Sequence, residues 1–276
     1  MEINPSENTS LFGLSDFFNE IASLYNKKKM PSKILLSGKK GLGKSTLAYH
    51  LINFILSENE EFKYDINKLI INEKNKSFKL VKNNSHPNFY LIDLINEKKD
   101  IDVAQIREMI SYTQKSAFNN QARFILIDNI ENLNKNSVNA LLKIIEEPNE
   151  NVFFLLINNN EKKILPTLKS RCLIFKINLT FNESMNISNQ ILRKDIFDFI
   201  SYDLIHFYVT PGEIINLVYF SIENNINLKD YSIINFLNFL IENKLYKKNK
   251  FIKNLLINFI ELFFLKEYKF STARNS

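Results

Sequence analysis

A glycine-rich stretch directly after a short apolar run is the feature that most limits how this chain can fold. The stretch covers residues 38–46 and reads GKKGLGKST, and the apolar run ILL precedes it at residues 34–36. It matches the pattern GxxxxGK[ST], in which a buried strand leads through a tight turn into a helix. Its glycines let backbone N–H groups turn toward phosphate oxygens, and the helix N-terminus favours negative charge there. The sequence therefore predicts a strand, loop and helix that bind ATP or GTP.

Individual residues of this loop suit the parts of a nucleoside triphosphate and its magnesium ion. We expect Lys44 to reach the terminal phosphates and Ser45 to ligate Mg²⁺. The predicted nucleotide-binding residues of the loop are Gly38, Gly41, Gly43, Lys44, Ser45 and Thr46. An ordinary loop rich in glycine and lysine is the alternative, and the complete pattern at a strand-to-helix junction argues against it.

Length and composition indicate a soluble globular protein with about two domains. The chain has 276 residues, of which 45% are hydrophobic and 24% are charged. Its net charge of +6 is modest and by itself is a weak indicator of nucleic-acid binding. The single cysteine, Cys172, excludes a disulfide framework and a zinc site made of cysteines. No segment predicts a signal peptide or a membrane span, so we expect a cytoplasmic protein without membrane contact.

Short apolar runs alternate with helical patterns between residues 34 and 177. Strands are predicted at residues 34–37, 89–94, 123–127, 152–157 and 173–177. Helices are predicted at residues 44–56, 103–118, 135–146 and 162–169. Asn134 suits the N-cap of the third helix, and Pro148 follows its end. Because the strands are almost continuously apolar, the pattern predicts a five-stranded parallel sheet with helices on both faces.

Two further regions differ from this alternating pattern. Residues 57–84 are polar and without clear periodicity, so we interpret them as a partly mobile insertion. No strand pattern recurs after residue 177. Helices are predicted there at residues 186–200, 202–208, 213–222, 232–243 and 251–266, and residues 271–276 are expected to be disordered. The lysine-rich run at residues 246–250 is interpreted as a solvated turn rather than a DNA-binding patch.

An acidic residue follows the third predicted strand. The apolar run at residues 124–127 leads to Asp128, which we expect to lie near the magnesium ion, with capping of the next turn as the alternative. Asn129 comes next, where a hydrolytic enzyme needs a carboxylate to deprotonate the attacking water. An amide can orient this water but cannot accept its proton, and we expect Glu131 to point elsewhere. The sequence therefore predicts nucleotide binding with weak or absent hydrolysis.

Several motifs give the chain a resemblance to a known family. They read HPN at residues 86–88, DVAQIR at 102–107, NALLKIIEEP at 139–148 and LPTLKSRC at 165–172. Together with the phosphate loop and Asp128, they resemble the AAA+ subunits of the bacterial DNA polymerase III clamp loader over about residues 11–177. The resemblance implies an AAA+ domain at residues 1–178, with a polar insertion at 57–85 that lacks the zinc cysteines of many relatives. It also implies a helical lid at 179–228 and a helical collar for oligomerisation at 229–276.

The resemblance implies functions for single residues as well. Arg171 corresponds to an arginine finger that acts in trans on the nucleotide of the adjacent subunit, and a structural arginine before the last strand is the alternative. Asn159 corresponds to the first sensor of the γ-phosphate, and its neighbours Asn158 and Asn160 leave this assignment open by one position. The turn at residues 210–215 offers no arginine for the second sensor.

With an amide at position 129, no arginine for the second sensor and no zinc cysteines, the chain resembles the delta-prime subunit most closely. Such a subunit would bind ATP with Mg²⁺, hydrolyse it poorly and donate Arg171 to a neighbour. The resemblance implies a heteropentameric ring with gamma/tau and delta subunits, which loads the sliding clamp onto primed DNA. The alternative is an active ATPase motor subunit similar to gamma/tau, in which Asn129 tolerates slow hydrolysis or Glu131 substitutes for the missing carboxylate. An unrelated nucleotide kinase is a remote third reading, because no acceptor site is recognisable.

Overall fold

The chain divides between Leu179 and Thr180 into two compact units. The computed structural model describes residues 4–95, 98–115, 121–205, 209–247 and 250–273. The N-terminal unit is an α/β domain and the C-terminal unit is built of helices. Each unit has an apolar core of its own.

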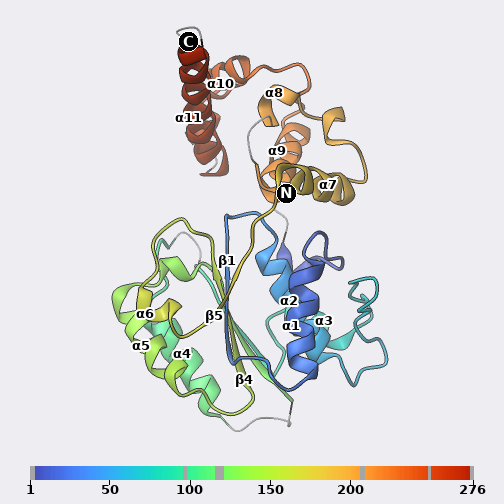
Figure 1. Cartoon of the computed structure of the whole chain (residues 1–276), viewed down its shortest axis with the longest axis vertical. Coiled ribbons are helices and arrows are strands. Elements are labelled where there is room, and N and C mark those ends of the chain that lie inside the picture. The colour runs from blue at the N-terminus through green and yellow to red at the C-terminus, as the bar shows by residue number, and fades with distance from the viewer. Residues whose placement is uncertain (1–3, 96–97, 116–120, 206–208, 248–249, 274–276) are drawn as a thin grey trace. The chain divides into compact units, whose positions relative to one another are not determined.

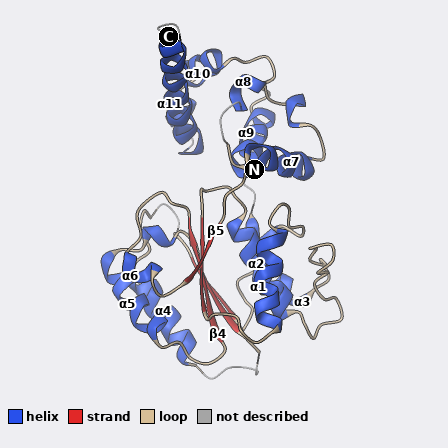
Figure 2. Ribbon diagram, in the orientation of Figure 1, coloured by secondary structure: helices blue, strands red, loops and turns tan. Residues whose placement is uncertain are grey.

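A five-stranded parallel sheet with the strand order β2-β3-β4-β1-β5 forms the centre of the N-terminal unit. Figure 2 shows its strands between two groups of helices. Its strands are β1 (Lys33–Ser37), β2 (Phe89–Ile92), β3 (Arg123–Ile127), β4 (Val152–Asn158) and β5 (Leu173–Lys176). The register places Ile34 of β1 opposite Leu155 of β4 on one side and Leu173 of β5 on the other. The predicted α/β fold with a five-stranded parallel sheet is confirmed.

Helices cover both faces of this sheet. Figure 1 shows α1 (Ser15–Asn26), α2 (Lys44–Leu56) and α3 (Lys76–Lys82) on one side, and α4 (Val103–Gln114), α5 (Lys135–Glu146) and α6 (Pro166–Lys169) on the other. Single 3-10 turns lie at η1 (Pro5–Glu7) and η2 (Ile130–Asn132). On the α4 and α5 side, Ile106 and Leu141 pack with Leu35, Ile125 and Phe154 of the sheet in one buried cluster. This packing holds the strand ends that form the candidate site.

Several helix boundaries differ from the sequence prediction. Helix α5 and its N-cap Asn134, whose side chain accepts from the Ser137 N–H, are as predicted. The helix predicted over 103–118 ends at Gln114, and residues 116–118 lie outside the described residues. Helix α6 covers only the end of the range predicted at 162–169, because Leu165 is extended and Pro166 begins the helix.

The polar segment at residues 57–84 contains α3, which its sequence pattern did not predict. Asn75 caps this helix by accepting from the Phe78 N–H. The Asn75 side chain also accepts a hydrogen bond from Asn53 of α2 and donates one to the Phe62 carbonyl. Tyr64 of the same segment stacks on Phe18 with 5.1 Å between ring centroids. These buried anchors join the segment to α1 and α2, and they depend on residues far apart in the sequence.

The C-terminal unit consists of helices around one apolar cluster. They are α7 (Phe181–Leu192), α8 (Tyr202–Ile205), α9 (Pro211–Glu223), α10 (Ile233–Glu242) and α11 (Lys250–Ala273), with 3-10 turns η3 (Ile196–Asp198) and η4 (Leu245–Lys247). Met185, Val218, Phe236 and Phe259 share this cluster, so it includes helices on both sides of residue 228. The division into a lid and a collar stays a prediction.

Two helix predictions in this unit are wrong. The helix predicted over 186–200 begins at Phe181, because Thr180 and Glu183 form a capping box, and it ends at Leu192, where Arg193 has a φ of +53°. Helix α11 runs to Ala273, beyond the predicted end at 266 and into the tail expected to be disordered. Residues 274–276 of that tail lie outside the described residues.

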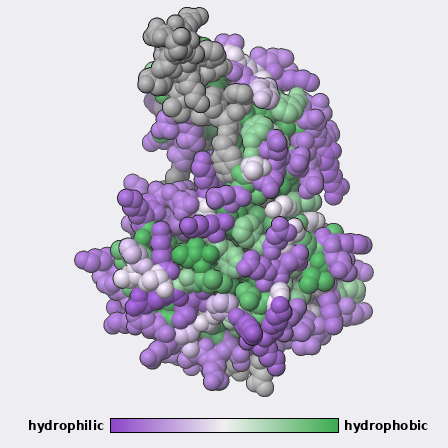
Figure 3. All heavy atoms as spheres, viewed as in Figure 1, coloured by the Kyte–Doolittle hydropathy of each residue, from purple (hydrophilic) through white to green (hydrophobic). Residues whose placement is uncertain are grey.

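Polar side chains dominate the surface of the N-terminal unit on the face that Figure 3 shows, with apolar patches between them. In the described part of the chain, no helix combines the length and the apolar character that crossing a membrane requires.

Candidate nucleotide-binding site

The loop between β1 and α2 has the backbone shape that its glycines predict. Gly41 and Gly43 have φ values of +85° and +82°, which residues with a side chain rarely adopt. Gly38 is required for a different reason, since a Cβ there would lie 2.3 Å from the Ile177 carbonyl oxygen. The loop therefore passes directly against the end of β5, and only glycine fits at this crossing.

Lys44 is folded back into the loop. Its side chain is buried, and Nζ donates to the carbonyl oxygens of Gly38 at 2.9 Å and Lys39 at 2.6 Å. Burial lowers the pKa of the Lys44 ammonium to about 8, while the Asp128 and Glu131 carboxylates act to raise it. An ammonium in the centre of a phosphate-sized loop is suited to meet the terminal phosphates of a nucleotide.

Ser45 and Asp128 lie together, although 83 positions separate them in the sequence. The Ser45 hydroxyl donates to Asp128 Oδ2 at 2.6 Å. Burial raises the pKa of Asp128, and the hydrogen bond from Ser45 opposes this rise. A hydroxyl and a carboxylate are oxygen ligands of the kind that Mg²⁺ prefers, so this donor set fits a magnesium ion held with a nucleotide. Thr46, the next residue of the loop, accepts a hydrogen bond from Asn8 at 3.4 Å instead.

Asn129, which directly follows Asp128 after the end of β3, is hydrogen-bonded at both ends of its amide. Its Nδ2 donates to Asp93 Oδ1 at 2.6 Å, and its Oδ1 accepts from Asn159 Nδ2 at 2.9 Å. Its backbone is in the left-handed region with a φ of +54°, which asparagine tolerates better than most residues. Of the three consecutive asparagines at residues 158–160, Asn159 is the one that contacts Asn129.

The other two asparagines of this group bond to each other. Asn158 Nδ2 donates to Asn160 Oδ1 at 2.6 Å and to the Ser37 hydroxyl at 3.2 Å. Ser37 is the last residue of β1. These contacts hold the start of the phosphate loop against the end of β4, and leave Asn159 to face position 129.

Glu131 does not point away from the site as we expected. Its Oε1 accepts from the Asn159 N–H at 3.0 Å, and the side chain is only 7% exposed. The left-handed conformation of Asn129 and the following 3-10 turn at Ile130–Asn132 bring the side chain back toward β4. A linear reading along the strand could not foresee this reversal.

Arg171 lies apart from these groups, between α6 and β5. Its Nε and Nη2 both donate to Glu146 Oε1, at 3.0 and 2.6 Å, and Nη1 donates to the Thr167 carbonyl at 2.8 Å. None of these hydrogen bonds goes to the phosphate loop. At its neighbour Cys172, burial raises the pKa of the thiol to about 11, so the thiol is protonated at neutral pH and unsuited to act as a nucleophile.

Sequence reasoning missed Asp93. The predicted strand at 89–94 placed this residue inside the sheet, whereas β2 ends at Ile92 and Asp93 is the first residue after it. An acidic residue directly after a buried parallel strand was the signal that could have found it, since strand ends are where sites form in parallel sheets.

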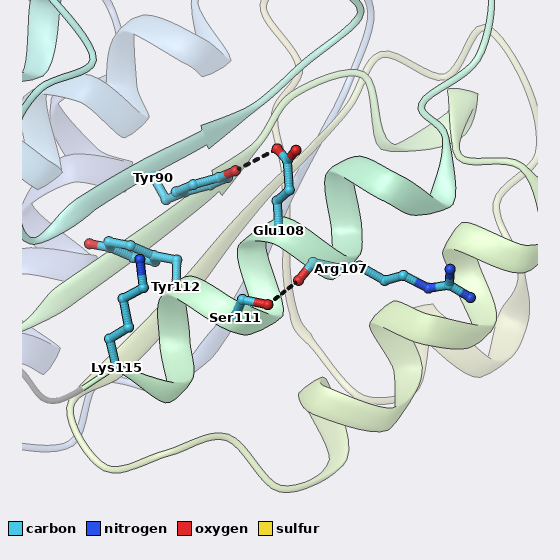
Figure 4. Close-up of a pocket in the computed structure, with 6 residues that line it drawn as sticks. All are labelled: Tyr90, Arg107, Glu108, Ser111, Tyr112 and Lys115. Carbon is cyan, nitrogen blue, oxygen red and sulfur yellow. Dashed lines mark hydrogen bonds between the residues drawn. The ribbon is translucent and has the colours of Figure 1, made fainter.

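A separate open pocket of about 440 Å³ lies beside β2 and α4 (Figure 4). Tyr90, Arg107, Glu108, Ser111, Tyr112 and Lys115 line it. The Tyr90 hydroxyl points toward Glu108, 3.5 Å from Oε2, and Tyr112 lies alongside Tyr90 with 5.0 Å between ring centroids. No residue of the phosphate loop lines this pocket, so it is distinct from the candidate nucleotide site.

Comparisons with known proteins match most of the chain to one family. A subunit delta' of DNA polymerase III from Buchnera aphidicola subsp. Schizaphis graminum is 33% identical over 187 residues, which are 64% of this chain and 52% of that protein. A subunit gamma of DNA polymerase III from the same organism is 30% identical over 82% of this chain and 62% of its own length. The chain spans about half the length of the delta' relatives that it matches.

Matches among solved structures are more distant. A gamma subunit-related protein of DNA polymerase III from Thermotoga maritima has a TM-score of 0.42 and 18% identity, over 63% of this chain and 52% of that one. The RuvB Holliday junction branch migration motor of the same organism has a TM-score of 0.45 and 14% identity, over 94% of this chain and 73% of its own. The family model described as DNA polymerase III, delta subunit, matches residues 13–180. The chain therefore belongs to the DNA polymerase III delta subunit family.

Proposed function

We propose that this chain is a clamp-loader subunit of the delta-prime type, which binds ATP, hydrolyses it poorly and donates Arg171 to a neighbouring subunit. The observation that carries the proposal is the pairing of a complete phosphate loop with an amide at position 129. The loop supplies the groups for binding, and the amide replaces the group that would activate water.

Nucleotide binding is supported by groups that the fold brings together. Lys44 and the N-terminus of α2 provide positive charge for the phosphates. Ser45 and Asp128 would hold Mg²⁺, which neutralises phosphate charge when it is bound. Gly41 and Gly43 leave backbone N–H groups free to turn toward phosphate oxygens.

Weak hydrolysis follows from the chemistry of position 129. A general base must accept a proton from the attacking water, and an amide has no such capacity at neutral pH. The Asn129 amide is also already hydrogen-bonded on both sides, to Asp93 and Asn159. Loss of a general base costs about 10²- to 10⁴-fold in rate. The isolated chain is therefore expected to hold ATP without turning it over rapidly.

Partnership with other subunits gives this chain its proposed role. Arg171 is partly exposed, and its ion-pair partner Glu146 is more exposed still. An accessible guanidinium can stabilise the charge of a phosphoryl group transferred in an adjacent subunit. We therefore propose assembly with gamma/tau and delta subunits into a heteropentameric ring in the cytoplasm. In this ring the chain would help to load the sliding clamp onto primed DNA.

One observation favours an active ATPase motor as a second candidate function. Glu131 is buried beside Asn159, and its Oε2 accepts no hydrogen bond from the described residues. A carboxylate oxygen without a partner retains the capacity to accept a proton from water. In this alternative Glu131 supplies the base that Asn129 cannot.

Measurements of MgATP binding and ATP turnover by the purified chain separate the two candidate functions. The delta-prime reading expects MgATP binding that Lys44→Ala abolishes, with turnover far below about 1 per second, the low end of ordinary enzymes. Turnover at or above that rate, lost in Lys44→Ala and in Glu131→Gln, would establish the motor instead. Purification of the tagged chain from its native cell tests the partnership, because a clamp-loader subunit brings its partner subunits with it. A chain that binds no nucleotide and carries no replication protein would refute both readings.

A further inference from the structure

Three polar side chains form a continuous hydrogen-bonded row across the carboxyl ends of three neighbouring strands. Asp93 follows β2, Asn129 follows β3 and Asn159 follows β4. The distances are 2.6 Å from Asn129 Nδ2 to Asp93 Oδ1 and 2.9 Å from Asn159 Nδ2 to Asn129 Oδ1. The row ends at Asn159, which follows β4. This strand pairs with β1, the strand that leads into the phosphate loop.

The chemistry of Asp93 sets the direction of these hydrogen bonds. A carboxylate only accepts, whereas an amide has a donor end and an acceptor end. Asn129 must therefore turn its NH₂ group to Asp93 and its oxygen to Asn159. Asn159 must in turn donate an N–H to Asn129, so its NH₂ group faces this end of the sheet. The second proton of this NH₂ group takes no part in the hydrogen-bonded row. Without a fixed acceptor at its origin, either amide could reverse.

Asp93 is itself held firmly. Its Oδ1 accepts from the Leu94 N–H at 2.6 Å, and its backbone carbonyl accepts from the Gln105 side chain at 2.8 Å. Gln105 belongs to the capping box at the start of α4. Asp93, the first member of the row, is thus held by the backbone of Leu94 and by Gln105 at the start of α4.

We propose that Asp93 is a positioning residue that makes the site prefer ATP to ADP. By fixing Asn129, it orients Asn159 so that the remaining amide proton is offered to the γ-phosphate. Phosphate oxygens accept hydrogen bonds and cannot donate them when ionised, so a reversed Asn159 amide would repel the same group. This inference rests on the proposed binding of ATP.

The same geometry explains why an amide suits position 129. A glutamate there would place a second acceptor-only group against Asp93, with like charge and no shared proton. In this chain Asp93 and Asn129 therefore form a matched pair, in which the carboxylate stands on β2 and the amide on β3.

The affinities of the full chain for MgATP and for MgADP, measured by calorimetry at one salt concentration, test the proposal. Wild type is expected to bind ATP more tightly than ADP. Asp93→Ala should lower the ratio of the two affinities about 10- to 100-fold, the usual effect of losing one hydrogen bond to a charged group, and should leave ADP binding unchanged. Asp93→Asn keeps an acceptor oxygen, which the Leu94 N–H would hold in the place of Oδ1, and should retain most of the ratio.

Two controls separate positioning from a loss of structure. Asp100→Ala removes an exposed acid of the same unit and should change nothing. The Asn129→Ala background removes the middle side chain of the hydrogen-bonded row. In this background Asp93→Ala should cause no further loss of the ratio. Thermal melts of each variant without nucleotide show that it is folded.

An unchanged ratio in Asp93→Ala, an equal loss in Asp93→Asn, or a full additional loss in the Asn129→Ala background would overturn the proposal. Equal wild-type affinities for ATP and ADP would also overturn it, while leaving nucleotide binding intact. A wild-type chain that binds neither nucleotide would overturn both this inference and the proposed function.

Discussion

Replacing Arg171 with alanine should leave this chain folded and sharply lower the ATPase rate of the complex that contains it. In the structure the guanidinium binds Glu146 through a single carboxylate oxygen and Thr167 through its carbonyl. The Arg171 and Glu146 side chains are 35% and 52% exposed, so water screens their attraction. The loss of such a surface ion pair lowers the free energy of unfolding by about 1 kcal/mol or less. For a domain of this size, that change moves the melting temperature by about 2–4 °C.

The expected loss of catalysis is much larger. An arginine finger contributes about 10³- to 10⁵-fold to hydrolysis in the site that it enters, equivalent to about 4–7 kcal/mol of transition-state stabilisation. A loss of at most about 1 kcal/mol in folding cannot account for a rate change of that size. The two consequences of one substitution therefore differ enough to be measured separately.

The assay is steady-state ATPase of the complex reconstituted from this chain and its partner subunits, with size-exclusion chromatography to show that each variant assembles. Glu146→Gln is the matched control, because it removes the ion pair but keeps the guanidinium, and its rate should equal wild type. Arg171→Lys keeps the charge without the planar fork and should recover only part of the rate. An assembled Arg171→Ala complex with the wild-type rate would refute the trans-finger role, and an equal defect in Glu146→Gln would show that the ion pair, not the finger, matters.

Three further predictions concern the stability of the two units. Gly38→Ala should lower the free energy of unfolding by about 1–3 kcal/mol, as overpacking does, and weaken MgATP binding, since its Cβ would meet the Ile177 carbonyl; unchanged urea denaturation and affinity would contradict this. Burial lowers the pKa of His50 to about 4. Between pH 6.5 and 4 the unfolded state therefore binds more protons than the folded state, and the free energy of unfolding decreases as the pH is lowered, by about 3 kcal/mol in total. His50→Gln should remove that part of the pH dependence, and matching urea midpoints of variant and wild type at every pH would disprove the assignment. Thr180→Ala removes the capping box of α7 and should cost about 1 kcal/mol, whereas Thr180→Ser should keep most of it, as circular dichroism during denaturation will show.

Much of the N-terminal unit could be predicted from the sequence, because its signals are local. The glycines of the phosphate loop, the apolar runs of the strands and the Asn134 cap each act within a few residues. Helices α2 and α5 accordingly have the predicted bounds. Where a local signal was overlooked, as at the capping box of Thr180 and Glu183, the predicted helix was wrong.

The sequence by itself determined that this chain has a glycine-rich loop between a strand of a parallel sheet and a helix, and that an amide directly follows Asp128. Only the tertiary structure decided which side chains meet at the strand ends. It brought Asp93 to Asn129, Asn129 to Asn159, and Glu131 back toward β4. These contacts join residues 28 to 36 positions apart, and they depend on strand order and on the left-handed turn at Asn129. Such contacts leave no periodic pattern along the chain, because they arise from the alignment of neighbouring strands in the sheet.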